Sequence, residues 1–121
     1  FKLVLTCPDV DALQECGETV FGASGYHFAF ASRHFAEVVA AGAEKGAAAR
    51  LLAGRLGVPM SHTMGAGDAM TDYPMLKACA LAFVPEDAPG SLLDIAAFVM
   101  PCCENGGLEQ AFAHALSVME G

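Results

Sequence analysis

The sequence lacks any hydrophobic run that approaches the roughly 18 residues needed to span a bilayer. It also lacks a basic start followed by a small-residue cleavage site, which is the pattern of a signal peptide. The hydrophobic fraction is nevertheless 55%. Alanine supplies much of it, and 13 glycines add further small residues, which indicates close packing of small side chains. These features predict a soluble, cytoplasmic globular protein with no membrane partner.

Basic residues are scarce, with 6 Lys and Arg against 14 Asp and Glu and a net charge of −8. They are scattered along the chain, at Lys2, Arg33, Lys45, Arg50, Arg55 and Lys77. Because a surface this negative repels phosphate backbones, we expect no nucleic-acid partner. The excess of carboxylates is compatible with a site for a divalent cation.

Signals of a disulfide framework or a zinc site are also missing. The five cysteines are odd in number and irregularly spaced, without a Cys-x-x-Cys pair: Cys7, Cys16, Cys79, Cys102 and Cys103. This pattern favours buried free thiols in a reducing compartment.

The first 40 residues predict a strand, a helix and a hairpin. The β-rich run 1–6 ends before a proline, and Asp9 is a suitable N-cap for the helix that follows. Residues 26–31 and 35–40 read as two strands joined by a tight connection. Because the sequence opens inside a strand-like run without a methionine, we expect a preceding segment that these residues do not include.

From Lys45 onward, helices and strands alternate. The expected helices are 47–56, 73–79, 91–95 (capped by Ser91) and 108–119, and the expected strands are 63–66, 81–84 and 98–100. Such alternation predicts parallel strands with right-handed crossovers and helices on both faces. The fold class is therefore α/β, with about three parallel strands, or half of a Rossmann-like sheet. A change of pattern at 41–44 divides the chain into units 1–41 and 42–121.

Two carboxylates lie at a strand-to-helix junction in the second unit. Asp68 and Asp72 follow the strand expected at 63–66, where open α/β sheets place their ligands. Gly65 and Gly67 let the backbone approach closely, and carboxylate oxygens suit Mg²⁺. The alternative is structural, with Asp68 capping the next helix and Asp72 in its first turn, both favoured by the helix dipole.

Lys45 is a second candidate. It precedes Gly46 at the start of a helix, where a cation is electrostatically out of place. Together with helix N–H groups, a basic side chain makes a site for an anion such as phosphate. The alternative is an exposed lysine on a turn.

In this order, three motifs resemble the Cof-type branch of the haloacid dehalogenase superfamily. Glu37-Val38 ends a strand, Lys45-Gly46 opens a helix, and residues 67–76 (GDAMTDYPML) resemble the family's Gly-Asp-x-x-Asn-Asp-x-x-Met-Leu motif. Phe83-Val84 resembles the family's strand before a small-residue turn, and residues 104–107 resemble its turn before the last helix. The resemblance covers essentially the whole chain, with residues 1–41 similar to the C-terminal half of a cap and 42–121 to the C-terminal half of the core.

The resemblance implies a Mg²⁺-dependent phosphomonoesterase of the sugar-phosphate type, which acts through an aspartyl-phosphate on a small phosphorylated metabolite. Asp68 would bind Mg²⁺, and Asp72 would support the metal or orient Lys45. Lys45 would neutralise the phosphoryl oxygens, as phosphoryl transfer requires. Arg33 and His34, at the bend of the hairpin, would contact the substrate, although a solvent-exposed hairpin is the alternative.

Two departures from the family pattern stand out. Thr71 replaces the family's Asn, so a contact from this position to phosphate would use a shorter side chain. The family's nucleophilic Asp-x-Asp is missing: Asp9 and Asp11 have the spacing but lack the Gly-Thr continuation, and we interpret them as part of a helix start. We therefore expect this chain to be inactive alone and to have the N-terminal half of the same protein as its partner.

Two other functions remain open on the sequence. A phosphomutase of the same superfamily shares these motifs and returns the phosphoryl group to a sugar. A non-catalytic α/β module is the alternative from another class. Because half of a parallel sheet exposes an unpaired edge, such a module would require a homodimer or a second chain.

Overall fold

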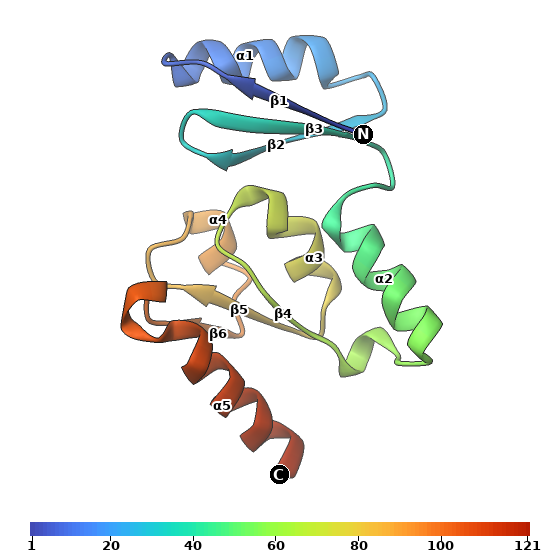
Figure 1. Ribbon diagram of the computed structural model, residues 1–121, viewed down its shortest axis with the longest axis vertical. Coiled ribbons are helices and arrows are strands. Elements are labelled where there is room, and N and C mark those ends of the chain that lie inside the picture. Colours follow the sequence, from blue (N-terminus) through green and yellow to red (C-terminus); the bar gives the residue numbers. More distant parts are fainter.

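The computed structural model describes residues 1–121, which form two sheets that follow one another along the chain (Figure 1). The first is antiparallel with strand order β1-β3-β2, and the second is parallel with order β4-β5-β6. The strands are β1 (Lys2–Thr6), β2 (Tyr26–Ser32), β3 (Phe35–Ala40), β4 (Met64–Ala66), β5 (Leu81–Pro85) and β6 (Phe98–Met100). The helices are α1 (Val10–Phe21), α2 (Lys45–Leu56), α3 (Tyr73–Ala78), α4 (Gly90–Leu93) and α5 (Gly107–Glu120). The predicted α/β class and the order of its elements are confirmed.

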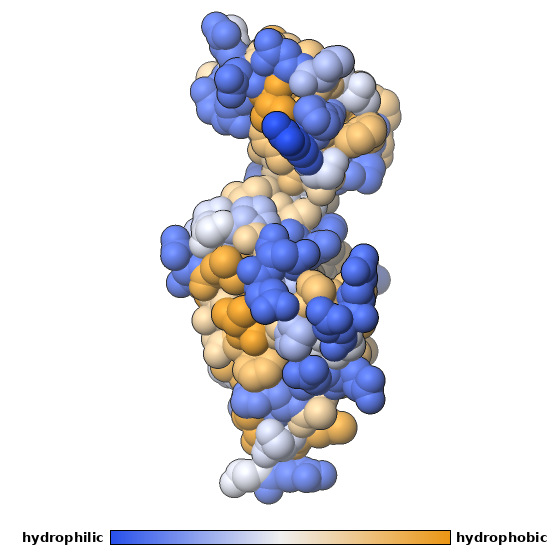
Figure 2. All heavy atoms as spheres, turned by 90° about the vertical axis from the view of Figure 1, so that its left-hand side faces the viewer, coloured by the Kyte–Doolittle hydropathy of each residue, from blue (hydrophilic) through white to orange (hydrophobic).

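The two sheets form separate lobes. Figure 2 shows a smaller upper lobe, made of the antiparallel sheet and α1, joined to the lower lobe by a narrow waist. Residues 41–44 connect β3 to α2 between the two lobes. None of the helices is both long enough and apolar enough to cross a membrane.

The helix α1 covers one face of the antiparallel sheet. Ala36 and Val38 of β3 point toward it and are buried, as is Leu13 of α1. Gly17 allows close contact, because a Cβ atom at this position would lie 2.2 Å from the ring of Phe28. Strand side chains alternate between faces, so the other face of this sheet is left uncovered by α1.

Helices cover both faces of the parallel sheet, as predicted. In the central strand β5, Ala82 and Val84 pack against α3 and α4, whereas Phe83 packs toward α5. Because β5 is buried on both faces, its sequence is a continuous run of apolar residues. The strand order leaves β4 at an edge of the sheet, with β5 as its only neighbour.

The amphipathic helix predicted at 108–119 is present as α5, but its large apolar side chains do not face the sheet. Gly107 and Ala111 are buried instead. The exposed apolar residues of α5 are Leu108, Phe112, Leu116, Val118 and Met119. Small side chains allow the helix to approach the sheet closely, which turns the larger residues outward.

Three local predictions require correction. The helix expected at 91–95 is α4, Gly90–Leu93, and Ser91 does not cap it. Pro89 precedes the helix, and its restricted φ suits a helix start, so the Ser91 hydroxyl is free to contact Met70 Sδ at 3.1 Å. The helix expected at 47–56 begins at Lys45, because Lys45 and Gly46 already have helical backbone.

All five cysteines are free, as predicted, but they are not all buried. Cys16 and Cys103 are exposed, which contradicts the expectation of buried thiols. Cys16 lies on α1, which is the outer layer of its lobe, so solvent reaches every side of the helix except the one facing the sheet. Cys103 opens a short 3-10 turn, Cys103–Asn105.

Candidate active site

Asp72 lies at the centre of the candidate site. Its side chain is buried, and one carboxylate oxygen accepts hydrogen bonds from the backbone N–H groups of Asp68 (3.1 Å) and Ala69 (3.2 Å). The other oxygen accepts a hydrogen bond from the ammonium of Lys45. Gly67 makes room for this carboxylate, because a Cβ atom there would lie 2.5 Å from Asp72 Cβ. Asp72 therefore holds the loop that follows β4 and fixes Lys45 beside it.

Lys45 is the first residue of α2, and its side chain is 54% exposed. Its position depends on Gly46, which brings the start of α2 against α3: a Cβ atom at Gly46 would lie 2.5 Å from the carbonyl oxygen of Pro74. The Lys-Gly pair thus has a packing reason as well as a chemical one. It places an ammonium group next to the loop that carries Asp68, with Asp72 between them.

We expect Gly46→Ala to destabilise the protein by about 2 kcal/mol, since an added methyl in a packed contact forces the two helices apart. Thermal unfolding followed by circular dichroism measures the change. Gly54→Ala in the same helix is the matched control, because a Cβ atom there meets no neighbour within 4 Å. That control is expected to stabilise α2 by about 0.5–1 kcal/mol, through the lower backbone entropy of alanine. Equal effects of the two variants would contradict the close-contact argument.

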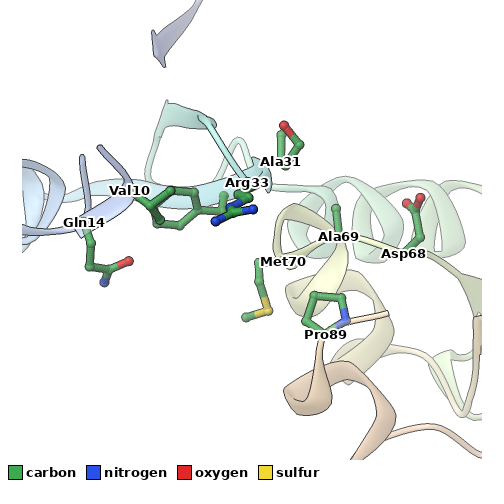
Figure 3. A pocket seen from close by; sticks show the side chains of 10 residues that line it. Val10, Gln14, Ala31, Arg33, Asp68, Ala69, Met70 and Pro89 are labelled. Atoms are coloured by element: carbon green, nitrogen blue, oxygen red, sulfur yellow. The ribbon is translucent and has the colours of Figure 1, made fainter. Parts of the chain in front are cut away.

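Asp68 is exposed and follows the carboxyl end of β4, and no side-chain hydrogen bond engages its carboxylate. It does not cap α3, so the structural alternative for this residue is wrong: α3 has no side-chain cap. Its side chain lines an open cavity of about 480 Å³ between the lobes, with Arg33 on the opposite wall. Figure 3 shows Arg33 reaching from the antiparallel sheet, with Asp68, Ala69 and Met70 on the other side.

The carboxylate oxygens of Asp68 fit part of a magnesium site. The carboxylate of Asp68 is free, whereas that of Asp72 already accepts three hydrogen bonds. This arrangement favours the orienting role predicted for Asp72 over the metal-binding one. No group of three or more His, Cys, Asp or Glu side chains is placed to hold a metal ion. Since Mg²⁺ often takes one or two protein carboxylates together with substrate phosphate, Asp68 is a suitable single ligand.

A second, smaller cavity of about 180 Å³ is lined by Lys45, which does not line the larger one. Thr71 and Lys45 form its wall on the parallel-sheet lobe, and the uncovered face of the antiparallel sheet forms the opposite wall. Thr71 therefore lines the same cavity as Lys45, and its contact with a substrate stays a prediction.

The structure separates the two residues predicted at the hairpin bend. Arg33 lines the same cavity as Asp68. His34 lies elsewhere: its Nδ1 is 3.2 Å from the carbonyl oxygen of Cys7, and it borders a shallow depression next to Phe35. Arg33 and His34 are the two residues of the turn between β2 and β3, and their side chains leave this turn in different directions. Substrate contact by His34 stays a prediction without support from its position.

Sequence reasoning missed the three polar residues of the antiparallel sheet that line the smaller cavity. They are Lys2, His27 and Glu37, and they share the face of the antiparallel sheet that α1 leaves open. The period-2 alternation of the strands was the available signal, since it places these residues on the face opposite the buried Ala36 and Val38.

The fold and site define a class of protein: an α/β protein with an exposed carboxylate at the end of a parallel strand and a lysine held beside it by a buried aspartate. The model of the haloacid dehalogenase-like hydrolase family matches residues 1–112, so this chain belongs to that family. The assignment made from the motifs, to the Cof-type branch of the superfamily, is confirmed. No match was found among curated proteins.

Solved structures have the same fold. A haloacid dehalogenase-like hydrolase from B. subtilis has a TM-score of 0.89 at 22% identity, and the match covers 94% of this chain and 40% of that one. A subclass IIB sugar phosphatase, BT4131, has a TM-score of 0.79 at 21% identity, with 94% and 42% covered. The phosphatase BT1666 from Bacteroides thetaiotaomicron has a TM-score of 0.76 at 29% identity, with 94% and 41% covered. The chain thus spans about two fifths of the length of these relatives.

Proposed function

We propose that this chain forms part of a Mg²⁺-dependent phosphomonoesterase that acts through an aspartyl-phosphate, with its nucleophile on a segment outside these 121 residues. The observation that carries the proposal is the arrangement of Lys45, Asp72 and Asp68, in which a buried aspartate holds a lysine beside a free carboxylate. Family membership and the similarity to two phosphatases support it. The substrate would be a small phosphorylated metabolite of the sugar-phosphate type.

Each residue has a role that follows from its position. Lys45 would neutralise the phosphoryl oxygens, and Asp72 would keep its ammonium in place, because phosphoryl transfer depends on positioning and charge neutralisation. Asp68 would hold Mg²⁺, whose charge would stabilise the same oxygens when the ion is bound. Thr71 would offer its hydroxyl to the substrate from beside Lys45.

We further propose that residues 1–41 act as the C-terminal half of a cap over a core that includes residues 42–121. The two cavities lie between these parts, so a substrate bound at Lys45 would contact the antiparallel sheet. Arg33 would face the substrate from the cap side of the larger cavity. The guanidinium of Arg33 is the only cation in the lining of this cavity, and it suits an anionic ligand.

The partner of this chain would be the N-terminal half of the same protein. The edge of β4 is unpaired, and an apolar groove beside it is lined by Leu52, Leu56, Val58 and Met64. Both features suit a strand that adds to the sheet at β4 and buries its apolar side chains. Figure 2 shows that hydrophobic side chains also gather on another face of the lower lobe.

The protein expressed from its complete coding frame provides the test. We expect Mg²⁺-dependent release of phosphate from phosphomonoesters, abolished by EDTA and lowered about a hundredfold by Asp68→Asn, which weakens the hold on the ion. We also expect an apolar strand followed by Asp-x-Asp in the added sequence. Asp94→Asn, at an exposed aspartate that follows the last residue of α4 and lines neither cavity, is the control and should keep full activity. A complete protein that hydrolyses no phosphomonoester with Mg²⁺ would overturn the proposal.

A further inference from the structure

The smaller cavity contains a polar group that the chain leaves without a partner. His27 lies on β2 and lines the cavity, and its Nε2 atom is buried with no hydrogen-bond partner. No other buried side-chain nitrogen or oxygen in the chain lacks a hydrogen-bond partner. Buried polar groups in folded proteins are nearly always hydrogen-bonded, so an orphaned nitrogen in a cavity wall calls for an explanation such as a bound ligand.

Glu37 lies on the same wall. The strand register places Glu37 opposite Ala29 and His27 opposite Val39, so the four residues share one face of the sheet. One carboxylate oxygen of Glu37 accepts a hydrogen bond from the Lys2 ammonium at 2.7 Å, which leaves its second oxygen free. The small side chains of Ala29 and Val39 keep the space between His27 and Glu37 open.

The two lysines around this cavity are each paired with a carboxylate, Lys2 with Glu37 and Lys45 with Asp72. Glu44 accepts a hydrogen bond from the backbone N–H of Gly42 at 2.8 Å, so no cation balances its negative charge. A group that enters the cavity beyond the phosphate therefore finds no free cation, which disfavours a second anionic group. Its volume of about 180 Å³ is also below the range of about 300–1,000 Å³ that is typical of sites for drug-sized ligands.

We propose that His27 and Glu37 bind the leaving group of the phosphomonoester and determine its class: a small group that carries hydroxyls and no negative charge. This inference rests on the proposed function. A hydroxyl both donates and accepts, so it satisfies His27 Nε2 in either tautomer and can donate to the free oxygen of Glu37. A carboxylate would be repelled by Glu37, and a bulky aromatic group would exceed the cavity and leave both polar groups unpaired. Lys2 acts as a positioning residue that holds Glu37.

Substitution of His27 in the protein from the complete coding frame tests the proposal. For a hexose 6-phosphate, His27→Ala is expected to lower kcat/KM about tenfold, equivalent to about 1.4 kcal/mol, largely through KM. For p-nitrophenyl phosphate, whose leaving group has no additional hydroxyl, the change is expected to stay within about twofold. His27→Gln, which keeps a hydrogen-bonding side chain, should recover part of the loss. Equal losses on both substrates would overturn the assignment.

His62→Ala is the matched control. It removes an exposed imidazole from a 3-10 turn of the parallel-sheet lobe, where no side-chain hydrogen bond engages it. We expect kcat/KM for both substrates to stay within about twofold of the parent value. A drop that matches that of His27→Ala would show that loss of any histidine lowers activity, and it would count against a specific role of His27.

A binding experiment separates this inference from the proposed function. The imidazole signals of uniformly ¹⁵N-labelled protein are followed by NMR while free hexose is added without phosphate. We expect the His27 signals to shift and the His62 signals to stay in place. A shift in a protein without phosphatase activity would support the hydroxyl site and reject the enzyme. Unchanged His27 signals in an active phosphatase would reject the site and leave the enzyme intact.

Discussion

Replacing Lys45 by methionine is expected to lower kcat for phosphomonoester hydrolysis about a thousandfold, because the only cation fixed beside the proposed phosphoryl site disappears. Methionine keeps the length and the apolar stem of the side chain, so the change is mainly one of charge. The substitution should lower the free energy of unfolding by about 1–3 kcal/mol, because the Lys45 side chain is half exposed but its loss leaves the buried carboxylate of Asp72 without its cation. Steady-state kinetics of the complete protein at saturating Mg²⁺ give the result.

Lys77→Met is the control for this substitution. Lys77 is an exposed lysine on α3, and its ammonium lies 6.0 Å from the centre of the Tyr73 ring. Its loss changes the net charge by the same amount without touching the site, so kcat should stay within about twofold. If Lys45→Met kept more than about a tenth of the parent kcat, Lys45 would not be the cation that stabilises the reaction, and the site assignment would fail.

Asp72→Ala is expected to remove both stability and activity. Three donors lose their acceptor together: the Lys45 ammonium and the backbone N–H groups of Asp68 and Ala69. The two backbone groups are part-buried, so we expect a loss of about 3 kcal/mol in the free energy of unfolding and a Tm lower by about 10 °C. With the loop and the lysine both released, kcat should fall at least about a hundredfold. Thermal unfolding and kinetics on one preparation measure both changes.

Asp72→Asn separates the two roles of this residue. An amide oxygen can still accept the backbone hydrogen bonds, whereas it cannot balance the charge of Lys45. We therefore expect Asp72→Asn to keep most of the stability and to lose most of the activity. Asp87→Ala, an exposed acidic residue in the loop after β5, should change neither quantity. Full activity in Asp72→Asn would show that Lys45 does not need its charged partner.

Much of the fold follows from local patterns in the sequence. Alternating side chains in 26–31 and 35–40 predicted the hairpin, and the apolar run at 81–84 predicted a strand buried on both faces. These predictions succeed because periodicity and turn residues act over a few neighbours. The predicted cap by Ser91 failed because a neighbouring proline already provided the helix start.

The candidate site was predictable only in part. Asp68, Asp72 and Lys45 were identified from their motifs, but the choice of roles needed the structure. The hydrogen bonds to Asp68 and Ala69 favour an orienting role for Asp72, and the position of Gly46 against Pro74 explains the glycine after Lys45. The contact between Gly46 and Pro74 joins residues that are far apart in the sequence, and no local pattern predicts it.

The sequence by itself determined the α/β class, the order of strands and helices and the absence of a disulfide framework, and it supplied the candidate residues for the proposed phosphoryl chemistry. Only the tertiary structure decided that Arg33 lines the same cavity as Asp68 while His34 lies elsewhere, and that His27 and Glu37 share a cavity with Lys45 and Thr71. The physical reason is the distance along the chain over which the deciding interactions act. Secondary structure depends on neighbours along the chain, whereas a site between two lobes depends on how separate sheets pack, which no local pattern encodes.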